Sequence, residues 1–74
     1  MLNTANKMLC HMWALDSNSP HTAGVLTDFA NLENPTPELA RQWATELRQG
    51  APAFSKRLAS ATVLDKLADK LLKI

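Results

Sequence analysis

The chain has 74 residues, 46% of them hydrophobic, and a formal net charge of +1. This length corresponds to one domain, so residues 1–74 are treated as a single helical unit. The near-neutral charge excludes a strongly basic nucleic-acid arm, and no apolar run approaches the roughly 20 residues of a membrane span. One cysteine, Cys10, excludes an intrachain disulfide and favours a reducing compartment, so a cytoplasmic location is expected.

The composition favours helices over strands. Twelve Leu and eleven Ala stand against two Val, one Ile and no Tyr, and no alternating apolar–polar run is long enough for a strand. We therefore predict an all-α fold, a compact bundle of four to five short helices. A core this small supplies only a few kcal/mol, so we also expect a homodimer.

The first three helices have clear limits. A first helix is predicted from Asn3 or Thr4 to about Leu15, before the turn-forming residues 16–19. A second should begin near Pro20 and end near Leu32, because Asn34-Pro35 opposes helical backbone. A third should begin at Pro37 with Thr36 as its N-cap, and Gly50 should terminate it. Its Trp43 is expected in the core.

The last segment has two interpretations. Phe54, Leu58 and Ala61 share one helical face, whereas the later leucines share another, rotated by roughly 100°. Thr62 followed by Asp65 resembles a capping box. We therefore predict a short helix at 52–59 and a final helix at 62–74; one kinked helix over 52–74 remains the alternative.

No motif for catalysis, metal binding or nucleotide binding is present. Cys10 and His11 are adjacent, so on a helix their side chains point about 100° apart, and His21 is distant in sequence. Asp65 and Asp69 alternate with lysines, which is typical of a solvated helix face. We expect no enzymatic activity, no cofactor and no metal.

A second function class is DNA binding. The third helix and the helix after Gly50 would form a helix-turn-helix that presents Ser55, Lys56 and Arg57 to phosphate. Glu38 and Glu46 on the preceding helix oppose that approach.

The interpretation that we favour is a small regulatory, inhibitory or adaptor protein that binds a larger protein, with no membrane partner. Several helices carry apolar arcs of about 160–180°, wider than one neighbour covers. The final helix, with Leu72 turned toward the protein's own core, is expected to form an association seam, and the first helix is the next candidate. The predicted interface residues are Met8, Met12, Trp13, Leu64, Leu67, Leu71 and Ile74.

Overall fold

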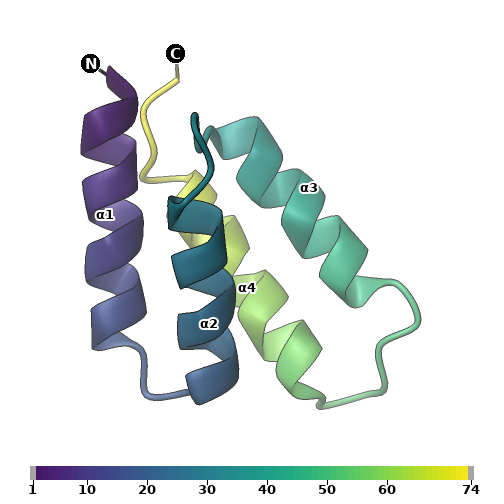
Figure 1. The fold of residues 1–74 in the computed structure, drawn as a ribbon. Coiled ribbons are helices and arrows are strands. Elements are labelled where there is room, and N and C mark those ends of the chain that lie inside the picture. The colour runs from purple at the N-terminus through teal and green to yellow at the C-terminus, as the bar shows by residue number, and fades with distance from the viewer. Residues whose placement is uncertain (1, 74) are drawn as a thin grey trace.

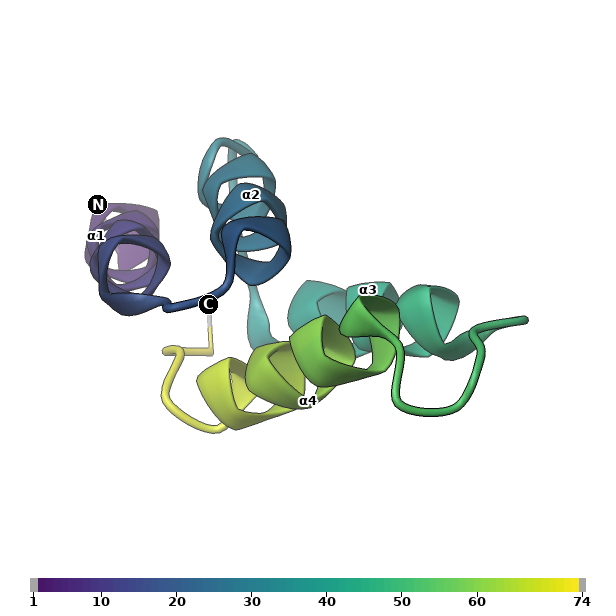
Figure 2. The ribbon, with the colours of Figure 1, turned by 90° about the horizontal axis from the view of Figure 1, so that it is seen from below.

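Residues 2–73 are described by the computed structural model, and the four helices in that range form two antiparallel hairpins (Figure 1). α1 (Leu2–Asp16) packs against α2 (Pro20–Ala30), and α3 (Pro37–Arg48) packs against α4 (Lys56–Ala68). α2 also packs on α4, which joins the hairpins. Seen from below, the hairpins form two layers, one of α1 and α2 and one of α3 and α4 (Figure 2). The predicted all-helical class is confirmed.

Three helices begin at a serine or threonine whose hydroxyl accepts a backbone N–H of the first turn. Proline follows the cap in α2 and α3, where its fixed φ suits the helix and its missing N–H leaves no unpaired donor. The predicted starts at Pro20 and Pro37 are confirmed. The capping bonds join Thr22 N to Ser19 Oγ at 3.4 Å, Leu39 N to Thr36 Oγ1 at 3.2 Å and Leu58 N to Ser55 Oγ at 3.4 Å.

The prediction for the last segment is wrong in both of its forms. A single helix runs over Lys56–Ala68, and its start is set by Ser55. Residues 52–54 form a turn instead of a helix, and Phe54 has φ of +60°. Thr62 lies inside α4 and donates its hydroxyl to the Leu58 carbonyl at 3.1 Å, so it is not an N-cap.

The core lies where the two hairpins meet. Phe29 of α2 is fully buried and meets the half-buried Trp43 of α3 edge to face, with ring centroids 5.2 Å apart. Alanines on α3 and α4 allow the helices to approach closely. The radius of gyration, 11.4 Å, is close to the value of about 11 Å expected for a compact chain of this length. The buried apolar residues are Cys10, Ala14, Leu26, Phe29, Ala30, Ala40, Ala44, Ala61, Leu64, Leu67, Ala68 and Leu71.

Candidate functional site

The outer face of α1 is an exposed apolar stripe. Met8, Met12 and Leu15 expose 61%, 56% and 86% of their surface. Their spacing of four and three residues aligns them along one side of the helix. The opposite side of α1 carries Asn6 and Cys10, both buried. α1 therefore has one apolar side in the protein core and a second in solvent.

Residues 8–15 include no Lys, Arg, Asp or Glu, and the charged residues Lys7 and Asp16 lie only at the two ends of the stripe. Lys7 is turned toward the segment after α2, where its Nζ donates to the Leu32 carbonyl at 2.7 Å. His11 is exposed beside the stripe, and Asp16 is exposed at the end of the helix. The stripe is thus long, narrow and almost neutral.

Trp13 does not belong to that stripe, because it lies about 100° around the helix from Met12, on the side of the buried Asn6. Its side chain is half-buried and packs against the core. It also lines a hollow of about 350 Å³ with Leu26 of α2 and Val63 of α4. Of the predicted interface residues on α1, the structure exposes the two methionines and gives the tryptophan mainly to packing.

The structure contradicts the association seam that was predicted on the final helix. Leu64 and Leu67 are fully buried and Leu71 is 7% exposed, all within the chain's own core. α4 packs on both α2 and α3, so its wide apolar arc is covered inside one chain. Leu72, expected to face the core, is 48% exposed, because α4 ends at Ala68 and the helical pattern stops before it. Ile74 lies outside the described residues.

The three predicted DNA contacts lie together at the start of α4 but have different roles. Ser55 is the N-cap. Lys56 is exposed, and Arg57 donates from Nη2 to the Glu46 carbonyl at 3.1 Å. The connection between α3 and α4 spans residues 49–55, longer than the three or four residues typical of a helix-turn-helix. These features do not favour DNA binding, which stays a prediction.

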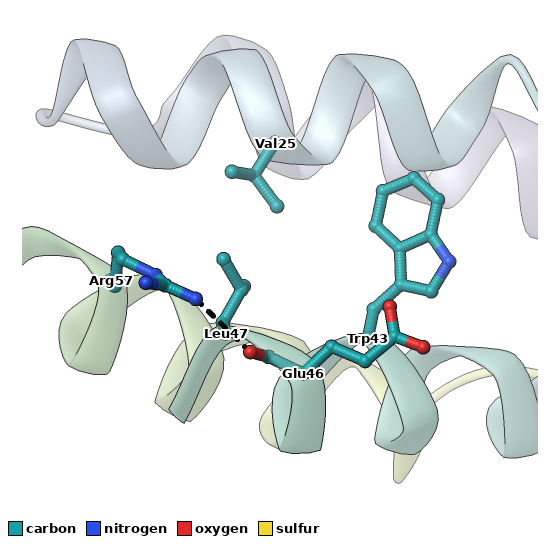
Figure 3. Close-up of a pocket in the computed structure, with 5 residues that line it drawn as sticks. All are labelled: Val25, Trp43, Glu46, Leu47 and Arg57. Carbon is teal, nitrogen blue, oxygen red and sulfur yellow. Dashed lines mark hydrogen bonds between the residues drawn. The ribbon is translucent and has the colours of Figure 1, made fainter. Parts of the chain in front are cut away.

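A pocket that the sequence did not reveal lies between α2 and α3. Figure 3 shows Val25 above it, Leu47 below it, and Trp43 and Arg57 at its two ends, with Arg57 held by its hydrogen bond to Glu46. Its volume is about 290 Å³, near the lower limit for a small-molecule site. From the sequence, Val25 and Leu47 were predicted only as core residues. Because they are 22 residues apart, nothing in the sequence indicated that their half-buried side chains line the same pocket.

A polar cluster joins α2 to α4. His21 Nδ1 lies 2.7 Å from Ser60 Oγ, and Thr22 Oγ1 lies 2.8 Å from the same oxygen. The serine–histidine distance is one that nucleophilic catalysis uses. Ser60, however, is fully buried in the middle of α4. The cluster satisfies buried hydroxyls between two helices and presents no nucleophile to a substrate.

Cys10 is likewise enclosed. Its side chain is fully buried, and burial raises the pKa of the thiol from 9.0 to about 11. The thiolate, which is the nucleophile and the metal ligand, is therefore disfavoured at neutral pH. Among residues 2–73, no group of three or more His, Cys, Asp or Glu residues is placed to hold a metal ion. No helix in that range has the length and apolar character needed to cross a membrane.

Comparison of the chain with protein-family models, with curated proteins and with solved structures finds no match.

Proposed function

We propose that this chain is a small non-enzymatic protein that binds a larger protein through the outer face of α1, as a regulatory, inhibitory or adaptor subunit. The observation that carries the proposal is the exposure of Met8, Met12 and Leu15 along one side of a helix whose other side is already buried. Intramolecular packing does not account for these three side chains. A partner that covered them would remove apolar surface from water.

The spacing of the stripe fits a known mode of recognition. Amphipathic helices enter apolar grooves through anchors at positions i, i+3 or i+4, and i+7. Met8, Met12 and Leu15 occupy positions i, i+4 and i+7. Methionine is flexible and polarisable, so it adapts to grooves of irregular shape.

In this proposal the expected homodimer also forms through the outer face of α1. Leu64 and Leu67 are in the core, so the stripe on α1 is the next surface for self-association. A dimer formed there would hide the stripe from a different protein. Self-association and partner binding are therefore expected to compete.

The experiment compares wild-type protein with Met12→Glu, which places a charge in the middle of the stripe. Thr27→Glu, on the exposed side of α2, adds the same charge elsewhere and is the control. Affinity purification from native lysate identifies the proteins retained by wild type. Calorimetry with the purified partner then measures the Kd of each variant.

We expect Met12→Glu to weaken binding by about tenfold or more, as loss of a central interface anchor does, while Thr27→Glu binds like wild type. In sedimentation, wild type should be dimeric at micromolar concentration and Met12→Glu monomeric. If Met12→Glu binds the partner as tightly as wild type, α1 is not the binding face.

A further inference from the structure

The loop between α3 and α4 holds a fully exposed phenylalanine in an unfavourable backbone conformation. Phe54 is fully exposed, and its φ is +60°. A bulky L-residue in this left-handed region is strained, because its Cβ crowds the neighbouring backbone. The loop is nevertheless ordered by backbone hydrogen bonds from Ala51 N to Arg48 O and from Ser55 N to Pro52 O, each 3.2 Å long. The isolated chain therefore accepts backbone strain at a residue whose ring gains no burial.

A shallow apolar hollow lies next to this ring. Its volume is about 520 Å³. Leu58 and Ala59 come from the first turns of α4, and Thr62 extends the hollow by one turn. Ser55, as the N-cap of α4, fixes the loop to the helix and so holds Phe54 beside the hollow. The ring and the hollow form a raised edge and a depression on one surface.

The exposed charged side chains on the Ala59 side of α4 are lysines. Lys56, Lys66 and Lys70 are exposed. Lys56 and Lys66 lie three and seven residues from Ala59 and so on its side of α4, whereas Lys70 lies beyond the end of the helix at Ala68. Among residues 2–73, none of these three lysines forms an ion pair with a carboxylate.

The aspartates of α4 are turned to the neighbouring helix instead. Asp65 pairs with Arg48 and Asp69 pairs with Arg41 of α3, each at 2.6 Å. These exposed pairs contribute little stability, but they neutralise the negative charges of α4 and leave its lysines uncompensated.

We infer that this surface, defined by Phe54, Leu58, Ala59, Lys56 and Lys66, binds an acidic segment of another protein that carries a bulky apolar side chain. The apolar side chain enters the hollow against the Phe54 ring, and the carboxylates meet Lys56 and Lys66. An aromatic side chain has only two rotatable side-chain bonds, so it loses little conformational freedom on binding, and aromatic residues are common among the anchors of interfaces.

This inference goes beyond the function proposed for α1. The loop lies on the side of the molecule opposite to α1 in both views (Figures 1 and 2). Two partners would therefore not compete for one surface, and a chain that holds both at once is an adaptor.

The test separates binding from folding through Phe54→Gly. Glycine adopts positive φ without strain, so this variant should be at least as stable as wild type while it lacks the ring. Random peptides displayed on phage are selected on the immobilised full-length chain. Enriched peptides are then synthesised, and their binding is measured by fluorescence anisotropy. The proteins compared are wild type, Phe54→Gly, Lys66→Glu and, as the control for α1, Met12→Glu.

We expect enriched peptides that combine Asp or Glu with Phe, Leu or Trp. Phe54→Gly and Lys66→Glu should each weaken their binding by about tenfold or more, whereas Met12→Glu should leave it unchanged. If Met12→Glu alone fails to bind its partner, the surface on α1 is established separately; if only the peptide assay fails, the inference about Phe54 fails alone.

Three outcomes would overturn the inference. One is a selection that enriches no acidic peptide. Another is peptide binding that is the same for Phe54→Gly as for wild type. The third is salt-sensitive binding of a DNA duplex through Lys56 and Lys66 that Phe54→Gly leaves intact, which would assign the lysines to phosphate.

Discussion

The side-chain amide of Asn6 binds the backbone of Leu72 at two points. Its Nδ2 donates to the Leu72 carbonyl at 2.9 Å, and its Oδ1 accepts the Leu72 N–H at 2.8 Å. Nδ2 also donates to the Pro35 carbonyl at 3.0 Å. One buried side chain of α1 thus fastens both the connection between α2 and α3 and the segment after α4.

Asn6→Ala should lower the free energy of unfolding by about 2–3 kcal/mol, because it leaves buried backbone groups without partners. The control is Gln42→Ala on the exposed side of α3, which should change stability by less than about 0.5 kcal/mol. Urea unfolding measures both values. Hydrogen exchange should show that the Leu72 amide loses protection in Asn6→Ala, and a protected amide there would contradict the assigned role.

Substitution by alanine should have opposite effects on stability at the two glycines. Gly50 has φ of +68°, and a Cβ at Gly24 or at Gly50 would meet no atom within 4 Å. Because neither site is sterically crowded, the backbone conformation decides whether alanine raises or lowers stability. Gly50→Ala should destabilise by about 1 kcal/mol, whereas Gly24→Ala within α2 should stabilise by about 0.5–1 kcal/mol. Thermal unfolding followed by circular dichroism gives the two shifts in Tm, and shifts of the same sign would contradict the argument.

Leu67→Asp should unfold the chain instead of merely separating a dimer. Leu67 is fully buried, and an unpaired buried carboxylate costs more than the few kcal/mol that a domain of this size has available. Leu72→Asp, at a residue that is 48% exposed, is the control and should stay folded. Circular dichroism and sedimentation distinguish the two outcomes. A folded, monomeric Leu67→Asp protein would restore the seam predicted on the final helix.

The buried thiol of Cys10 should make the stability of the protein fall at alkaline pH. Burial raises the pKa of its thiol in the folded state from 9.0 to about 11. The stabilisation that follows is complete below pH 9 and is lost as the pH rises toward 11, because only the unfolded chain releases the proton easily. The urea midpoint of wild type should therefore fall more between pH 8 and pH 10 than that of Cys10→Ala.

The stability of Cys10→Ala at pH 7 shows whether the substitution disturbs the fold. This variant should remain folded and lose about 1–2 kcal/mol of stability at pH 7 through the small cavity that it creates. All other titrating groups are the same in the two proteins. Equal losses of stability between pH 8 and pH 10 would show that the thiol does not contribute.

The sequence by itself determined the helix starts whose signals are local. Ser19 and Thr36 stand directly before proline, and a hydroxyl that caps its own helix needs no distant partner. The wide apolar arc of the first helix predicted an interface at Met8 and Met12, and both side chains are exposed, but the same argument applied to the final helix pointed to Leu64 and Leu67, which are buried.

Only the tertiary structure decided how the last segment folds. Helix periodicity divided residues 52–74 at Thr62, but α4 touches both α2 and α3, so Ala61 from one apolar face and Leu64 and Leu67 from the other are all buried in one continuous helix. The periodicity also extended the helix to the end of the chain. In the structure α4 ends at Ala68, and Asn6, 66 residues away from Leu72, supplies the hydrogen bonds that a further turn of helix would have supplied. A local pattern contains no information about a partner so distant along the chain, and this is why the position of the leucines, core or surface, was decided by packing.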